Sequence, residues 1–185
     1  DTPIYHLPWI AHLAKSGDAV FYPAYEAQPG APNALQHLIA ALNIATQQAL
    51  GNLRPPVVMI GYSRGAGLAV DYTAVATAVG PVPKAVLAVF PAMSDPKLDL
   101  RGVAKGTRFT FLVGDEDTTV GSLGQRILAG MLIKASYPEA LVKSVIVQSH
   151  DGWHATHTSV LDTSAPAREA FWAPADAMIA SVLKG

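Results

Sequence analysis

The chain has 185 residues, half of them apolar and only 15% charged, with a formal net charge of -1. This length suits one domain with a full core, and the near-neutral charge excludes both a disordered chain and a basic surface for nucleic acid. The absence of cysteine excludes disulfides and a thiol nucleophile, and no apolar run is long enough to cross a bilayer. We therefore expect a single domain over residues 1–185 that acts on a small molecule, in a compartment that the sequence leaves open.

Helical and extended patterns alternate along the chain. Apolar residues at a spacing of three or four predict helices, and short apolar runs between turn-forming residues predict buried strands. In chain order, we expect a helix over Pro3–Lys15, a strand over Ala19–Tyr22, a helix over Leu35–Leu50, a strand over Val57–Ile60, a helix from about Ser63 to Val79, a strand over Ala85–Phe90, an irregular stretch over Pro91–Gly106, a strand over Phe109–Val113, a helix over Gly121–Ala135, a strand over Val142–Val147 and a helix over Ala167–Leu183. This alternation indicates the α/β class, a three-layer αβα sandwich around a mainly parallel sheet.

The sequence GYSRG at residues 61–65 lies between a predicted strand and a predicted helix. A serine at such a turn is held in a strained backbone conformation, and the flanking glycines let the strand and the helix approach each other. The new helix directs its first N–H groups and the positive end of its dipole to the same place, which suits an oxyanion. The pattern therefore predicts Ser63 as a nucleophile and the N–H of Arg64 as an oxyanion donor.

Two chemically rich loops follow later strands. Three consecutive acids occupy positions 115–117, and the segment SHDGWHATH occupies positions 149–157. Since active groups gather beyond the carboxyl ends of parallel strands, we expect Ser63, an acid and a histidine to meet at that edge of the sheet. An imidazole takes the proton of the serine hydroxyl, and a carboxylate fixes the tautomer of the imidazole.

The histidine-rich segment also allows a metal site made of His150, His154 and His157 with Asp151. Imidazoles at this spacing share one face of a helix, but Gly152 disfavours a helix there and the H-E-x-x-H pattern is absent. We therefore expect neither a metal nor another cofactor.

Three segments carry a resemblance to a known family: GYSRG, the loop LVGDEDTTVG at residues 112–121 and the segment HATHTSV at residues 154–160. They resemble the α/β-hydrolase superfamily, and within it small serine esterases and dienelactone-hydrolase-like enzymes. The likeness extends to YHLPWIAHLAKSGDAVFYPAY at residues 5–25 and so covers nearly the whole chain. The resemblance implies Asp117 as the acid, with Asp115 as the alternative, and His157 as the base, with His154 as the alternative.

The resemblance also implies a feature that this chain does not show. Members of the superfamily have a strand ending in a His-Gly-type oxyanion loop before the first helix, and that strand lies between the counterparts of the Val20 and Val57 strands. We therefore expect a core that lacks the N-terminal strands. Either the natural protein has an upstream piece, or the Val20 strand pairs directly with the Val57 strand. An unpaired edge strand would also permit a homodimer.

The favoured function is hydrolysis of carboxylic esters with short acyl chains through an acyl-enzyme. Tyr62, Met93 and Trp153 are the expected substrate contacts, because each follows the end of a predicted strand. One alternative is a catalytically impaired binding or scaffold protein on the same fold, which the missing oxyanion strand favours. The other alternative is an acyltransferase with the same triad.

Overall fold

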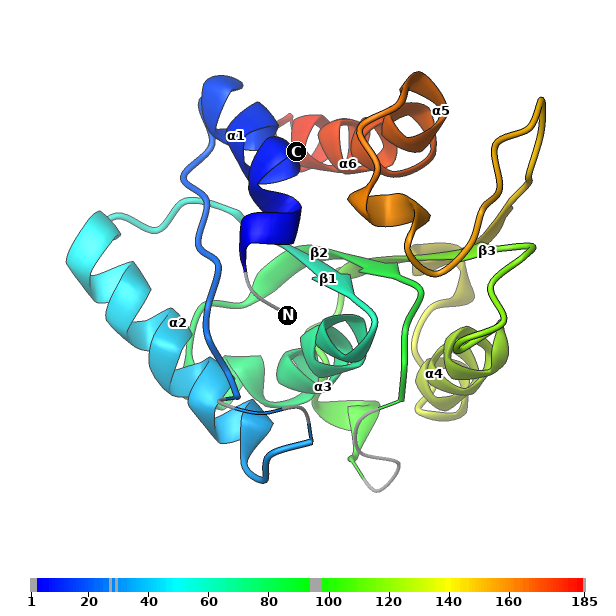
Figure 1. Cartoon of the computed structure of the whole chain (residues 1–185). Coiled ribbons are helices and arrows are strands. Elements are labelled where there is room, and N and C mark those ends of the chain that lie inside the picture. Colours follow the sequence, from blue (N-terminus) through cyan, green and yellow to red (C-terminus); the bar gives the residue numbers. More distant parts are fainter. Residues whose placement is uncertain (1–2, 27, 29, 94–97, 185) are drawn as a thin grey trace.

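A four-stranded parallel sheet lies at the centre of the molecule (Figure 1). The structure is a computed structural model that describes residues 3–26, 28, 30–93 and 98–184. The strands are β1 (Val57–Tyr62), β2 (Pro83–Val89), β3 (Arg108–Gly114) and β4 (Val142–Val147). Their order in the sheet is β1-β2-β3-β4, so each strand pairs with the next one along the chain. The carboxyl ends of all four strands consequently lie along one edge of the sheet.

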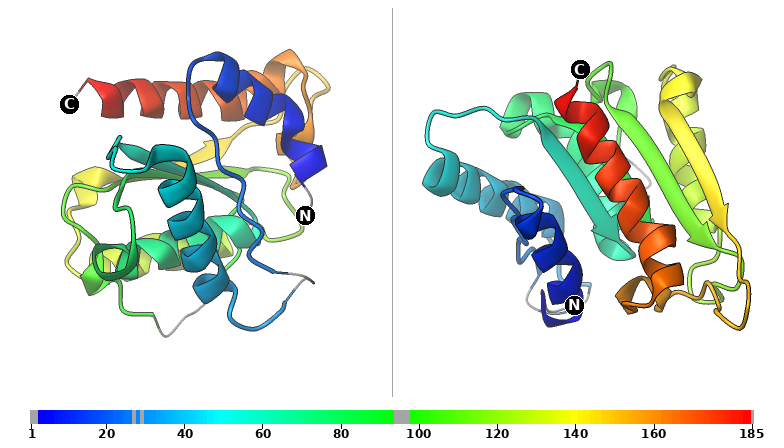
Figure 2. Two further views of the ribbon diagram at one scale, coloured as in Figure 1. Left: turned by 90° about the vertical axis from the view of Figure 1, so that its left-hand side faces the viewer. Right: turned by 90° about the horizontal axis from the view of Figure 1, so that it is seen from above.

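Helices cover both faces of this sheet (Figures 1 and 2). One face packs against α3 (Arg64–Val79) and α4 (Leu123–Lys134), and the other packs against α1 (Leu7–Lys15) and α6 (Ala173–Leu183). The helix α2 (Ala34–Leu50) packs against α3. The buried side chains of β2 alternate between the two faces, as the period of a strand requires: Ala85, Leu87 and Val89 face α1 and α6, and Val86 and Ala88 face α3 and α4. The predicted three-layer α/β architecture is confirmed.

The predicted helices are present, and several are interrupted or flanked by short turns. The short elements are η1 (Pro3–His6), η2 (Leu100–Gly102), η3 (Glu139–Leu141), η4 (Ser159–Leu161), α5 (Ala165–Ala167) and η5 (Arg168–Trp172). The last predicted helix consists of α5, a π-helical turn at η5, and α6. Pro174 accounts for this break, because a proline has no N–H to donate to the preceding turn and its ring displaces the carbonyl there.

The predicted strand over Ala19–Tyr22 is wrong. Residues 19–22 form no strand, and β1 pairs with β2 alone among the residues that the structure describes. The side chain of Val20 packs against the core on the face of α1 and α6 instead. The apolar run thus reflects packing rather than pairing, and the proposed pairing of the Val20 and Val57 strands is wrong as well.

No helix in the described part of the chain combines the length and the apolar character needed to cross a membrane.

Candidate active site

The turn between β1 and α3 has the geometry that its sequence predicts. Ser63 has a φ of 52°, in the left-handed region that a non-glycine residue rarely adopts. Its N–H donates to the carbonyl of Val89 (2.9 Å), and its own carbonyl accepts from the N–H of Ala92 (3.0 Å). These bonds fasten the strained residue to β2 and to the segment that follows β2.

The turn is also very tightly packed. A Cβ at Gly61 would lie 2.5 Å from the carbonyl oxygen of Gly65 and 2.6 Å from the Cα of Ala66. Strand and helix can approach this closely only because position 61 lacks a side chain. The side chain of Ser63 is thereby presented at the carboxyl edge of the sheet.

Ser63, His157 and Asp117 lie within hydrogen-bond distance of one another in series. The Oγ of Ser63 lies 3.0 Å from Nε2 of His157, and Nδ1 of His157 lies 3.1 Å from Oδ2 of Asp117. The three residues follow β1, β4 and β3 respectively, and 94 positions separate Ser63 from His157 along the chain. The Asp117 side chain is fully buried and the His157 side chain is 12% exposed. We call these three side chains the triad.

Backbone groups orient the carboxylate of Asp117. Its Oδ1 accepts hydrogen bonds from the N–H groups of Thr119 (2.7 Å) and Val120 (3.2 Å), which leaves Oδ2 facing His157. A carboxylate in this position accepts the Nδ1–H of the imidazole, so that Nε2 presents its lone pair to the Ser63 hydroxyl. These two N–H donors form an Asx-type turn, and the sequence Asp-Thr-Thr could have indicated it.

Aromatic side chains surround the imidazole of His157. The rings of Tyr62 and Phe90 lie 5.1 and 5.4 Å from it, centroid to centroid. The hydroxyl of Tyr62 donates to the carbonyl of His157 (3.0 Å), and burial together with the charge of Asp117 raises the pKa of Tyr62 to about 12. The phenol therefore remains a hydrogen-bond donor at neutral pH and holds the backbone of His157.

One further ring, which sequence reasoning did not identify, lies next to this group. The imidazole of His6 lies 5.7 Å from the ring of Tyr62, and burial lowers the pKa of His6 below its ordinary value. A histidine at the start of a helix carries no sequence signal for such a position.

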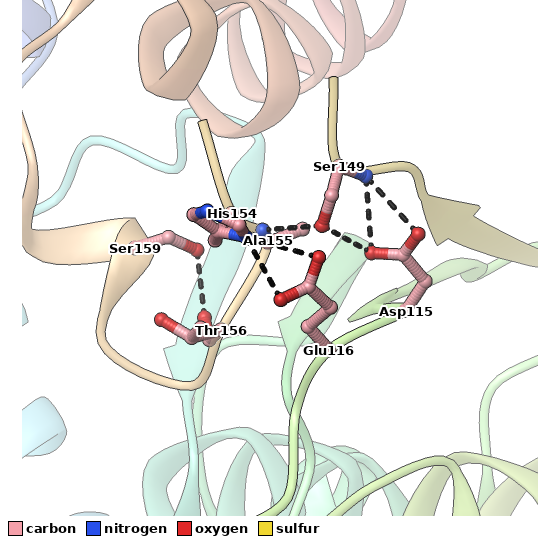
Figure 3. A network of polar contacts seen from close by, with 7 residues as sticks. All are labelled: Asp115, Glu116, Ser149, His154, Ala155, Thr156 and Ser159. Atoms are coloured by element: carbon pink, nitrogen blue, oxygen red, sulfur yellow. Dashed lines mark hydrogen bonds and ion pairs between the residues drawn. The ribbon is translucent and has the colours of Figure 1, made fainter. Parts of the chain in front are cut away.

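The alternative acid and base have different partners. Asp115 accepts hydrogen bonds from Ser149, and Nδ1 of His154 lies 2.9 Å from a carboxylate oxygen of Glu116 (Figure 3). Neither residue contacts Ser63 in the bonds that the structure shows. Among the described residues, no group of three or more His, Asp or Glu side chains is placed to hold a metal ion, so His150, His154, His157 and Asp151 form no such group.

The contacts of Arg64, Met93 and Trp153, the other predicted site residues, are as follows. Arg64 is the first residue of α3, and its guanidinium forms an ion pair with Glu26 at 3.1 Å. Met93 packs against the core on the face of α3 and α4. Trp153 packs against the core on the opposite face and lines, with His150, a groove of about 380 Å³ beside β4.

No family model matches the chain. No curated protein matches it in sequence either. Solved structures do match it, all at low sequence identity. The α/β-hydrolase enzyme MGS-M1 from a Medee basin deep-sea metagenome library is 21% identical with a TM-score of 0.58, and the match covers 87% of this chain and 65% of that one.

Two esterases match over similar lengths. Esterase PE8 is 20% identical with a TM-score of 0.55, and the match covers 80% of this chain and 60% of that one. A Bacillus cereus carboxylesterase is 16% identical with a TM-score of 0.50, covering 77% and 59%. The chain thus spans 59 to 65% of the length of these three structures. The likeness concerns the fold: the chain has an α/β fold with a four-stranded parallel sheet flanked by helices, and this fold matches α/β-hydrolase structures.

Proposed function

We propose that the protein hydrolyses carboxylic esters with short acyl chains through an acyl-enzyme formed on Ser63. The observation that carries the proposal is the series of contacts from Ser63 Oγ through His157 to Asp117, at 3.0 and 3.1 Å. The strained backbone at Ser63 is a second support, because it is typical of nucleophiles at a strand-to-helix turn. The fold shared with esterases is consistent with this chemistry.

Each half-reaction uses the same proton path. As the Oγ of Ser63 attacks the ester carbonyl, Nε2 of His157 takes the hydroxyl proton and then gives it to the departing alcohol. Water next attacks the acyl-enzyme while His157 takes one of its protons, and that proton returns to Ser63 as the carboxylic acid leaves. Asp117 stabilises the imidazolium in both steps.

The developing oxyanion requires hydrogen-bond donors, and the N–H of Arg64 is our candidate for one of them. It lies at the N-terminus of α3, where the helix dipole also favours negative charge. Loss of a single donor typically lowers the rate by about a hundredfold or more. If the Arg64 N–H acts alone in this chain, we expect slow but measurable turnover.

The substrate contacts are part of the same proposal. The ring of Tyr62 lies next to His157 and is well placed to contact the acyl group. Met93 directly follows Ala92, whose N–H bonds to the carbonyl of Ser63, and we assign it and Trp153 to more distant parts of the substrate site.

The decisive variant is Ser63→Ala. It removes the nucleophile, so we expect the turnover of p-nitrophenyl acetate and butyrate to fall by about a thousandfold or more. Ser181→Ala is the matched control, because the Ser181 hydroxyl donates to the carbonyl of Met178 within α6. A fluorophosphonate probe should label the native chain at Ser63. Turnover unchanged in Ser63→Ala would rule out Ser63 as the nucleophile, whereas no labelling of Ser63 in the native chain would favour a binding role.

A further inference from the structure

The loops after β3 and β4 are joined at three points, of which the contact within the triad is only one. Each of the three consecutive acids after β3 has a different partner in the loop after β4, and Figure 3 shows two of these contacts. The pairs are Asp115 with Ser149, Glu116 with His154, and Asp117 with His157. The pairs made by Asp115 and Glu116 lie outside the proton path.

Ser149 connects Asp115 to the part of this loop that leads from Trp153 to His157, which we call the return arm. Its N–H donates to both carboxylate oxygens of Asp115 (3.0 and 3.1 Å), and its hydroxyl donates to Oδ1 (2.6 Å). The same hydroxyl accepts the N–H of Ala155 (2.9 Å), two residues before His157. A single side chain thus couples the carboxylate of Asp115 to the backbone that leads into His157.

The segment between Ser149 and Ala155 is a tight hairpin. His150 and Trp153 exchange two backbone hydrogen bonds (3.0 and 2.8 Å), and the two residues between them, Asp151 and Gly152, have φ values of 50° and 78°. Positive φ at both positions is what a two-residue type I′ turn requires. Because the hairpin is this tight, a bond that fixes Ser149 before it also restricts the position of Ala155 after it.

The return arm also packs closely on the end of β3. Ala155 is fully buried, and a Cβ at Gly114 would overlap its carbonyl oxygen. The arm therefore has little room to move toward the sheet, and the bonds of Ser149 keep it from moving away. Together these contacts determine where the imidazole of His157 lies.

The contact of Asp115 with Ser149 and that of Glu116 with His154 differ in strength. The side chains of His154 and Glu116 are 62% and 46% exposed, and a pair this accessible to water contributes little stability. Asp115 is exposed as well, but it accepts three hydrogen bonds from Ser149, and its carboxylate makes each of them charge-assisted, so the number of bonds distinguishes the two contacts. Ser149 with Asp115 is therefore the principal attachment.

We propose that Asp115 and Ser149 are positioning residues that hold Nε2 of His157 against the hydroxyl of Ser63, with Glu116 and His154 as a weaker second attachment. This proposal rests on the hydrolase function proposed above. It explains why all three consecutive acids of this loop contact the loop that carries the base.

The first test is the kinetics of Ser149→Ala with p-nitrophenyl butyrate. We expect kcat to fall by on the order of ten- to a hundredfold with KM nearly unchanged, because a displaced base affects the chemical step more than binding. Asp115→Ala should lose at least as much, because it removes all three bonds from Ser149, whereas Ser149→Ala leaves the two bonds from the Ser149 N–H in place. Asp115→Asn should lose less than Asp115→Ala, since a carboxamide oxygen still accepts a bond. Ser181→Ala and Asp99→Asn are the controls, the latter because Asp99 pairs with Arg101 on η2.

A double variant separates positioning from two independent effects. If Ser149 and Asp115 act through a shared contact, the loss of kcat in Asp115→Ala with Ser149→Ala should be smaller than the losses of the two single variants combined. Additive losses, or a kcat in Ser149→Ala within twofold of the native value, would overturn the proposal. Should Ser149→Ala fail to fold, the comparison of Asp115→Ala with Asp115→Asn decides in its place.

A spectroscopic measurement reports the position of His157 without any ester. The Nδ1–H of His157 facing Asp117 should give a low-field proton resonance, assigned by its loss in His157→Gln. We expect this resonance to broaden or disappear in Ser149→Ala and to persist in Ser181→Ala. An unchanged resonance in Ser149→Ala would contradict the positioning role, whereas a native chain without turnover would contradict the proposed function alone.

Discussion

At the scale of single residues, the site depends on how the imidazole of His157 is held. Its Nδ1 faces Asp117, its carbonyl accepts the hydroxyl of Tyr62, and its ring lies beside that of Phe90. Two of these contacts act on the ring and one acts on the backbone. The residue is thus fixed through both its ring and its backbone, which is what its proposed role as a base would need.

Tyr62→Phe tests the backbone contact. The substitution keeps the ring and removes the only hydroxyl that the structure shows bonded to the carbonyl of His157. We expect kcat to fall by about tenfold, the equivalent of about 1.4 kcal/mol, with KM little changed. Tyr72→Phe is the matched control, because the Tyr72 hydroxyl donates to Pro81 and the pKa of Tyr72 is likewise raised to about 12. A loss of kcat in Tyr72→Phe as large as in Tyr62→Phe would argue against a local effect.

At the scale of elements, the site is made by the close approach of β1 and α3. Position 61 allows no side chain because two backbone atoms of the helix lie within 2.6 Å of where its Cβ would be. The same approach produces the positive φ at Ser63 and directs the start of α3 toward it. Strand, turn and helix therefore act as one unit.

Gly61→Ala should disrupt this unit. Because backbone rather than a flexible side chain surrounds the added methyl group, we expect a loss of about 3 kcal/mol or more in the free energy of unfolding, or no folded protein. Urea denaturation followed by circular dichroism measures it. Gly130→Ala is the control, since Gly130 lies in α4 with nothing within 4 Å of its added Cβ. That variant should be unchanged or more stable by up to about 1 kcal/mol. A Gly61→Ala protein as stable as Gly130→Ala would refute the packing argument.

Sequence could predict this unit because its signals are local: an unbroken apolar run, two glycines and a small-residue helix. The residues alone could not decide between His154 and His157, because which of the two rings lies next to Ser63 depends on how the loop after β4 folds. It also misjudged Ala19–Tyr22, since a short apolar run looks the same whether it pairs in a sheet or packs into a core. The partners of Asp115 and Glu116 were equally out of reach, because they lie more than thirty positions away along the chain.

At the scale of the whole molecule, the sheet has two unlike edges. Half of the residues of β4 are exposed and two of these are polar, whereas β1 is made almost entirely of apolar side chains that are half-buried. Within the described residues, β1 has one neighbouring strand and offers its second row of backbone groups for pairing. Edges of this kind promote association between copies of a chain.

We expect reversible formation of a homodimer through β1 as the concentration rises, measured by sedimentation velocity. Val57→Lys places a charge on that edge and should shift the distribution toward the monomer. Val57 is a suitable position because it lies outside the three core clusters of the described residues. Ser144→Lys introduces the same charge in β4 and should have no effect. A single monomeric species at all concentrations would rule this association out.

The contact between α1 and α6 has a consequence for biosynthesis. The ring of Trp9 stacks 6.2 Å from that of Trp172, the last residue of η5 directly before α6, and His12 binds both carboxylate oxygens of Asp176 in α6. The part of α1 that contacts Trp172 and Asp176 therefore stays uncovered until these residues have left the ribosome, since Asp176 is translated more than 150 codons after His12. Stalling translation before residue 168 should therefore leave the ring of Trp9 more accessible to solvent quenchers than it is in the complete fold.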